Sequence, residues 1–197
     1  RNEKEEVDHH YVESRLRSLE RQLNPHFLFN ALNSVAELIH QDPDKAEESV
    51  LKISSFLLSS MDEQALLPLK YELRNVRQYI ELENIRFSGR ITLHLQDAPP
   101  SWRVPKFSIQ LLAENAIKHG LGDVKTGLSI TVTFDTERQC IRVKNDGKAM
   151  RSTAFGIGLN NLNQRLQLLC RGRLEVVATE EPTFCIYVKD CHENTDR

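Results

Sequence analysis

The sequence has no apolar run long enough to cross a membrane, and its positive and negative charges nearly cancel. A bilayer-spanning helix requires about 20 mostly apolar residues, and no stretch of the 197 residues approaches that length. The first residues show no signal-peptide pattern. A formal net charge of −2 provides no positive field for nucleic acid, so we expect no nucleic-acid partner. Because 40% of the residues are apolar, the sequence instead predicts a globular protein with a buried core.

Cysteine is scarce, and its spacing matches no metal site. The four cysteines form no Cys-x-x-Cys pair and have no accompanying histidine spacing: Cys140, Cys170, Cys185 and Cys191. A structural zinc site requires such a cluster. The arrangement therefore argues against zinc, and it favours free thiols in a reducing compartment over two disulfides.

Glycine is absent from residues 7–61, where the pattern is helical throughout. We expect one helix over residues 7–40 and a second over 43–61, because Asp42 can cap the second helix and Pro43 suits its first position. Pro68 ends this unit, and a further helix is expected over residues 70–87. The prediction is a helical hairpin over residues 1–66 and a separate domain over residues 67–197.

After Gly89, strand and helix patterns mix. Alternating apolar residues predict strands over residues 91–96, 128–134, 140–145, 174–179 and 184–189. A helix is expected from Pro105 to Gly120, and another begins at Gly156. Since the order is not a regular strand–helix alternation, we predict an α+β fold in which helices cover one face of a sheet.

The first helix places a histidine directly after a proline. Four apolar residues form a seam with spacing 4, 3, 4: Val12, Leu16, Leu19 and Leu23. Beyond Pro25 the same spacing falls on polar residues: His26, Asn30, Asn33, Glu37 and His40. A proline inside a helix costs about 3 kcal/mol. The pattern therefore predicts a kink at Pro25 that presents His26 on an exposed polar edge, and the competing interpretation is an ordinary surface histidine beside a tolerated kink.

Four segments resemble motifs of one family, in that family's order. The segment "LNPHFLFNALNS" resembles the phosphoacceptor motif of the LytS-type sensor histidine kinases. The segment "YELRNVRQYIELENIRF" resembles the connector helix, "IQLLAENAIKHG" the N box of the ATP-binding domain, and "GIGLNNLNQRL" the glycine-rich box with its following helix. The resemblance covers nearly the whole chain.

The resemblance implies a two-component signalling enzyme. His26 would accept phosphate from ATP and pass it to an aspartate on a response-regulator receiver domain. Two hairpins would form a four-helix bundle in a homodimer, and the second domain would be a Bergerat-type α/β sandwich. Most relatives carry membrane sensor segments, which would precede Arg1, so the chain is expected to be the cytoplasmic portion of a plasma-membrane protein.

The resemblance also implies which residues hold ATP and Mg²⁺. Asn115 matches the metal-holding position, and a single amide oxygen can suffice because magnesium keeps several waters. Glu114 is a candidate for positioning a water, and Lys118 and His119 for reaching phosphate oxygens. On the first helix, Asn30 is a candidate for orienting water during dephosphorylation of the partner.

The remaining candidates lie in loops and at strand ends. Gly156, Gly158 and Leu159 open a helix, where free N–H groups suit a phosphate. The usual adenine-binding Asp-Asn-Gly is replaced by Asn145, Asp146 and Gly147, and either of the first two can accept the adenine amino proton. Thr183, preceded by Pro182 where glycine is usual, is a further candidate adenine contact.

Two other functions compete with the kinase interpretation. An ATP-driven machine of the same superfamily would hydrolyse ATP with water, but Leu111 stands where its glutamate would be, one helical turn before Asn115. A non-catalytic dimeric scaffold with a weakened nucleotide pocket is the other, suggested by Asn145 and Pro182.

Overall fold

The computed structural model describes residues 25–60, 64–122, 126–189 and 191, with only the backbone of Pro25 and His26. The chain divides into two compact units, residues 1–63 and 64–197. Leu66, expected at the end of the helical unit, pairs with Pro105 in the second unit. The apolar seam before Pro25 and the predicted kink lie outside the described residues.

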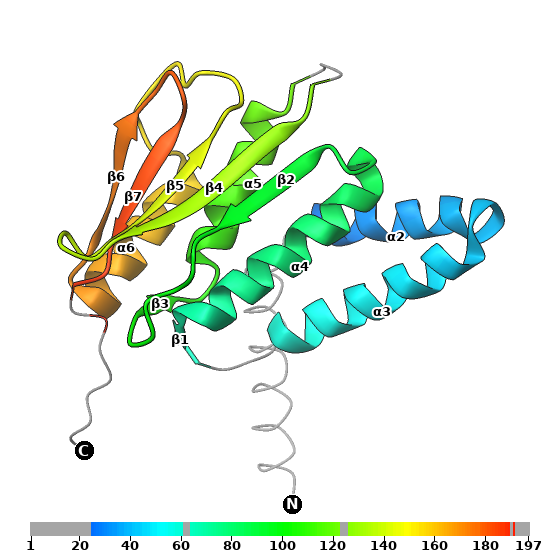
Figure 1. The fold of residues 1–197 in the computed structure, drawn as a ribbon, viewed down its shortest axis with the longest axis horizontal. Coiled ribbons are helices and arrows are strands. Elements are labelled where there is room, and N and C mark those ends of the chain that lie inside the picture. Colours follow the sequence, from blue (N-terminus) through cyan, green and yellow to red (C-terminus); the bar gives the residue numbers. More distant parts are fainter. Residues whose placement is uncertain (1–24, 61–63, 123–125, 190, 192–197) are drawn as a thin grey trace, which may run out of the picture. The chain divides into compact units, whose positions relative to one another are not determined.

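The described part of the first unit, residues 25–60, forms two antiparallel helices, α2 (Pro25–Gln41) and α3 (Pro43–Ser60) (Figure 1). Asp42 separates them as predicted, since its carboxylate accepts a hydrogen bond from the backbone N–H of Lys45 at 3.1 Å. The helices pack through Phe27 and Phe56, whose rings meet edge to face with centroids 5.4 Å apart. The helical hairpin is confirmed over these residues.

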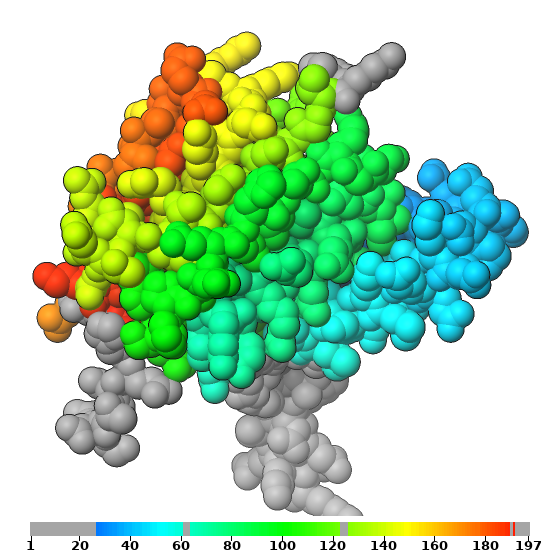
Figure 2. Space-filling model, in the orientation of Figure 1, coloured from blue at the N-terminus to red at the C-terminus, as the bar shows by residue number. Residues whose placement is uncertain are grey.

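The second unit is built on a mixed five-stranded sheet in the order β2-β4-β5-β7-β6. Only β2 and β4 are parallel. The strands are β2 (Ile91–Leu95), β4 (Leu128–Asp135), β5 (Cys140–Asn145), β6 (Arg173–Ala178) and β7 (Thr183–Tyr187). Figure 2 shows how segments far apart in sequence, from green β2 to orange β6, lie side by side on one surface of this unit.

Three helices form a layer against one face of that sheet: α4 (Leu69–Phe87), α5 (Ser108–Gly120) and α6 (Ile157–Cys170) (Figure 1). Alternate strand residues such as Ile130 and Val132 are fully buried beneath the helices, whereas Thr131 and Thr133 face the other side. The predicted α+β fold, a sheet with helices on one face, is confirmed. Among the helices described, none is both long and apolar enough to cross a bilayer.

The predicted start of α5 was wrong. Pro105 does not begin the helix but ends β3 (Arg103–Pro105), which pairs with β1 (Leu66–Pro68) in a small antiparallel ribbon that the sequence did not predict. The helix begins at Ser108, after Phe107 adopts a left-handed conformation with φ 63°. Three-residue strands are too short to give a periodic signal, and a proline before an apolar helical pattern favours a helix start.

The prediction of free thiols holds for one cysteine pair and fails for the other. Cys140 and Cys185 are free and buried. Cys170 and Cys191 form a disulfide, with their Cα atoms 4.6 Å apart. The bond joins the last residue of α6 to the segment after β7, residues 21 positions apart, so tertiary structure rather than a local motif creates the pair.

Reducing this disulfide is expected to lower the free energy of unfolding by about 3 kcal/mol, because the closed loop restricts the unfolded chain. Urea unfolding with and without dithiothreitol measures the change. The double variant Cys170→Ser/Cys191→Ser should be insensitive to the reductant. Four free thiols on titration of the unreduced, denatured protein would contradict the bond.

Candidate functional site

Two glycines bring the end of α5 against the loop after β5. A Cβ atom on Gly147 would lie 2.5 Å from Gly120 Cα and 2.8 Å from the Gly120 carbonyl oxygen. The backbone N–H of Lys148 also donates to that carbonyl at 3.3 Å. Because only glycine permits so close a backbone approach, the helix with Asn115 and the Asn-Asp-Gly turn are fixed against one another.

The structure distinguishes Asn145 from Asp146. Asn145 is 5% exposed and points to the helix-covered face, in step with Ile141 and Val143. Its Oδ1 accepts the Gly147 N–H at 3.0 Å, and its Nδ2 donates to the Pro182 carbonyl at 3.5 Å. Asp146 is exposed, and its carboxylate accepts the N–H of Ser129 at 2.7 Å. Asn145 therefore lies beside α5, whereas Asp146 bonds to the neighbouring strand β4.

Thr183 lies next to this turn but on a different face. It pairs with Lys144 across β5 and β7, so the two side chains share the face opposite to Asn145. Its hydroxyl donates to the Glu181 carbonyl at 2.7 Å. Pro182, not Thr183, is the neighbour of Asn145, whose backbone N–H donates to the Pro182 carbonyl at 3.0 Å.

The candidates on α5 differ in exposure. Asn115 is half-buried, and its side chain makes no hydrogen bond with the described part of the chain. Lys118 and His119 are exposed in the last turn. Glu114 accepts a hydrogen bond from Gln110 Nε2 at 3.1 Å, and burial raises the pKa of its carboxyl group. Burial raises the pKa of Tyr79 on α4, and the negative charge of Glu114 adds to that rise.

The N-terminus of α6 lies beside the Asn115 edge of α5. Gly156 is the N-cap residue and makes no side-chain capping bond. A Cβ atom on Gly158 would lie 3.6 Å from Leu111 Cδ1, one turn before Asn115. Leu159 is buried beneath the first turn. The first N–H groups of a helix lack partners within the helix, so this end suits an anion.

His26 and Asn30 lie one helical turn apart on α2. His26 occupies the first turn, and its side chain lies outside the described residues. Asn30 is half-buried, and its carbonyl accepts the Ser34 hydroxyl at 3.0 Å.

The residues present fit a magnesium nucleotide better than a metal ion held by protein ligands alone. No group of three or more His, Cys, Asp or Glu side chains gathers around a possible metal position within the described ranges. Magnesium binds oxygen, keeps several waters and shares phosphate oxygens. Asn115 has one such oxygen, and the α6 N-terminus, which has free N–H donors, lies near Leu111 one turn before it on α5.

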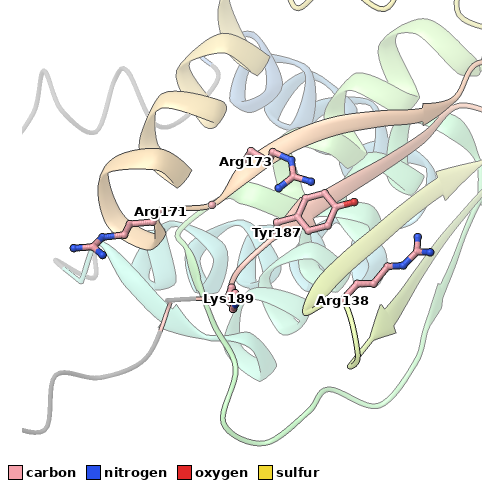
Figure 3. Close-up of a pocket in the computed structure, with 6 residues that line it drawn as sticks. Arg138, Arg171, Arg173, Tyr187 and Lys189 are labelled. Atoms are coloured by element: carbon pink, nitrogen blue, oxygen red, sulfur yellow. The ribbon is translucent and has the colours of Figure 1, made fainter.

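A basic hollow of about 440 Å³ lies at the opposite end of the sheet from Asn145. Its lining comes from the start of β6, the end of β7 and their neighbours: Arg138, Arg171, Gly172, Arg173, Tyr187 and Lys189. Figure 3 shows that these side chains do not converge, since Arg171 points away from the rest. Arg173 stacks over the Tyr187 ring at 4.0 Å and pairs with Glu175. The hollow is therefore not part of the site.

Comparisons with known proteins identify the family of the chain. The family model described as "Histidine kinase" matches residues 14–91. The sensor protein LytS of Enterococcus faecalis is 34% identical over 135 residues, which are 66% of this chain and 23% of that protein. The sensor histidine kinase/phosphatase LytS of Staphylococcus aureus is 32% identical over 176 residues, 79% of this chain and 30% of that protein.

A solved structure shares the fold. The histidine kinase domain of the blue-light activated histidine kinase EL346 from Erythrobacter litoralis superposes with a TM-score of 0.50 at 16% identity, covering 91% of this chain and 95% of that domain. The family model and the sequence relatives place the chain among the protein-histidine kinases. Within that class it belongs to the LytS-type sensor family. The chain spans less than a third of the length of these curated relatives.

Sequence reasoning missed two charged residues near α5, of which Glu72 is fully buried and Arg165 half-buried. Glu72 of α4 and Arg165 of α6 both bond to the backbone at the beginning of α5. Glu72 lies within the segment that resembles the connector helix, but a glutamate in a helix pattern indicates an exposed position. No local signal identifies a residue whose partners lie 35 or more positions away.

Proposed function

We propose that this chain uses ATP and Mg²⁺ to phosphorylate His26 and then transfers the phosphoryl group to an aspartate of a response-regulator receiver domain. The observation that carries the proposal is the meeting of three elements in the second unit. The Asn115 edge of α5, the Asn145–Gly147 turn and the N-terminus of α6 lie together, in a chain whose helical hairpin carries His26.

Each element has one role in holding the nucleotide. The Asn145 Oδ1 retains a lone pair beyond its bond to Gly147 and would accept the adenine amino proton. The first N–H groups after Gly156 would donate to phosphate oxygens, with Lys118 and His119 of the neighbouring helix end as further donors. Asn115 would hold the magnesium ion, which neutralises phosphate charge when bound.

The transfer forms one bond and breaks one. A neutral ring nitrogen of His26 attacks the γ-phosphorus, the bond to the bridging oxygen breaks, and ADP leaves with that oxygen. Phe27 follows the histidine directly, so no acidic neighbour on the chain assists as a base. Asn30, one turn later, would orient a water when the phosphorylated partner is dephosphorylated.

Exposed apolar side chains on the hairpin support a homodimer. On α2 and α3 they include Phe29 at 70% exposure and Leu58 at 67%. Such residues on both helices of a hairpin would be covered when two hairpins form a four-helix bundle.

Leu58→Glu is therefore expected to convert the dimer to a monomer, because the bundle would bury an unpaired carboxylate. Light scattering after size-exclusion chromatography measures the mass. Leu168→Glu is the matched control, since Leu168 of α6 is 84% exposed in the other unit and its variant should stay dimeric. A Leu58→Glu protein that remains a dimer would contradict this interface.

The proposal is tested by incubating the protein with γ-labelled ATP and Mg²⁺ and then adding a receiver domain. The expected result is an acid-labile, alkali-stable label on the protein that moves to the receiver domain. Steady phosphate release without any phosphoprotein would instead indicate a simple ATPase. Leu111 argues against that outcome, because it occupies the position at which such an ATPase would have a glutamate. Its side chain lies near Gly158 at the start of α6.

A non-catalytic scaffold is the second candidate function. It is favoured by the Asn145 amide, which has both polar ends engaged, and by Thr183, which faces away from it. Calorimetry that detects no binding of ATP with Mg²⁺ would support it.

In either case we propose that the chain is the cytoplasmic portion of a sensor attached to the plasma membrane.

A further inference from the structure

Helix α5 begins without a capping residue of its own. Its N-cap position is Phe107, which has no polar side chain and a left-handed backbone. The preceding Pro105 has no polar side chain, and the ammonium group of Lys106 is a donor that cannot accept a bond from an N–H group. A helix start buried in this way would leave N–H groups without partners at considerable cost.

Glu72 supplies the cap from another helix. The carboxylate lies in the first turn of α4 and is fully buried. Its Oε2 accepts the N–H of Phe107 at 3.0 Å, while its Oε1 accepts those of Ile109 at 3.0 Å and Gln110 at 3.3 Å. One side chain thus accepts hydrogen bonds from three backbone N–H groups. Its negative charge also interacts favourably with the positive end of the α5 dipole.

Arg165 connects α6 to the backbone at the start of α5. Its Nη1 donates to the Lys106 carbonyl at 2.7 Å, immediately before the start of α5. Its positive charge also acts on Glu72. Burial raises the pKa of Glu72 to about 7, although the three N–H donors and Arg165 oppose that rise.

The bonds of Glu72 and Arg165 fix the start of α5 and connect it to α6, the two helices that would hold the nucleotide. Asn115 is seven residues, or two turns, after Ser108 on the same rigid helix. Gly156 and Gly158 are at the beginning of the helix that carries Arg165. A shift at the start of α5 therefore moves Asn115 relative to the α6 N-terminus, which contacts α5 through Gly158 and Leu111.

We propose that Glu72, with Arg165, is a positioning residue that fixes Asn115 against the phosphate-binding end of α6. This inference rests on the proposed function. In this proposal the helix that resembles the connector, α4, has a specific role. Its first turn fixes the position of α5, the helix that would bind magnesium.

The test measures binding of a non-hydrolysable ATP analogue by calorimetry, with and without Mg²⁺. In Glu72→Gln, the amide NH₂ faces a backbone N–H, so at least one capping bond is lost. The gain in affinity that Mg²⁺ provides is expected to fall about tenfold, as for residues that orient a metal ligand. Affinity without Mg²⁺ should change little, which general destabilisation would not reproduce.

Glu83→Gln is the matched control. Glu83 is also buried on α4, but its ion-pair partner Arg86 lies on its own helix at 3.5 Å. This variant should keep the magnesium gain of the wild type. Arg165→Gln should lose it, and this second variant decides the question if Glu72→Gln does not fold.

The outcomes separate this inference from the proposed function. If wild type gains affinity from Mg²⁺ and both Glu72→Gln and Arg165→Gln gain equally, the positioning role is overturned while the nucleotide site remains. An equal loss in Glu83→Gln would also overturn it. If wild type binds no analogue, the proposed function and this inference fall together.

Discussion

Asn115→Ala is expected to reduce magnesium-dependent ATP binding and phosphorylation by about 100-fold or more, because it removes the amide oxygen that we propose as a ligand of the metal. Asn115 is half-buried on α5 and makes no side-chain hydrogen bond within the described ranges, so its loss should not destabilise the fold. Binding is measured by calorimetry and phosphorylation by labelled ATP, each at several magnesium concentrations.

Asn115→Asp is the matched control, since a carboxylate keeps an oxygen at the same position. It should retain magnesium-dependent binding, whereas the alanine variant should not. Unchanged magnesium dependence in Asn115→Ala would contradict the proposal that Asn115 is the ligand that α5 provides to the metal.

Gly147→Ala is expected to abolish measurable nucleotide binding. The added Cβ would lie 2.5 Å from Gly120 Cα and 2.9 Å from Asn145 Oδ1, and the backbone of Gly120 cannot move aside as a flexible side chain would. The turn must therefore separate from the end of α5, and Asn145 must leave its place. We also expect a loss of about 1–3 kcal/mol in the free energy of unfolding, typical of overpacking.

Gly156→Ala provides the control for stability. No atom of the described residues lies within 4 Å of a Cβ built on Gly156, so its variant should unfold at the wild-type urea concentration. A Gly147→Ala protein with wild-type stability and nucleotide affinity would show that the close approach to Gly120 is unnecessary.

Local signals were sufficient for most elements of the fold. Asp42 and Pro43 predicted the turn of the hairpin because a cap and a first-turn proline act on their own backbone. The alternation of β5 also predicts the burial of Asn145, which continues the series of buried residues Ile141 and Val143. Reading that alternation to the end of the strand would have separated Asn145 from Asp146.

The features that the sequence did not predict depend on distant partners. Helix α5 begins at Ser108 because Glu72, on another helix, satisfies the first N–H groups. The disulfide forms because the end of α6 meets the segment after β7, which places Cys170 beside Cys191. Neither contact leaves a pattern within a window of a few residues.

The most direct test of the account is to map the phosphoryl group after incubation with ATP and Mg²⁺, using mass spectrometry under alkaline conditions. The account predicts a single phosphohistidine at His26 and no label in His26→Gln, while His40→Gln, altered on the same helix, labels as wild type. Phosphate on any other residue, or label retained by His26→Gln, would contradict it.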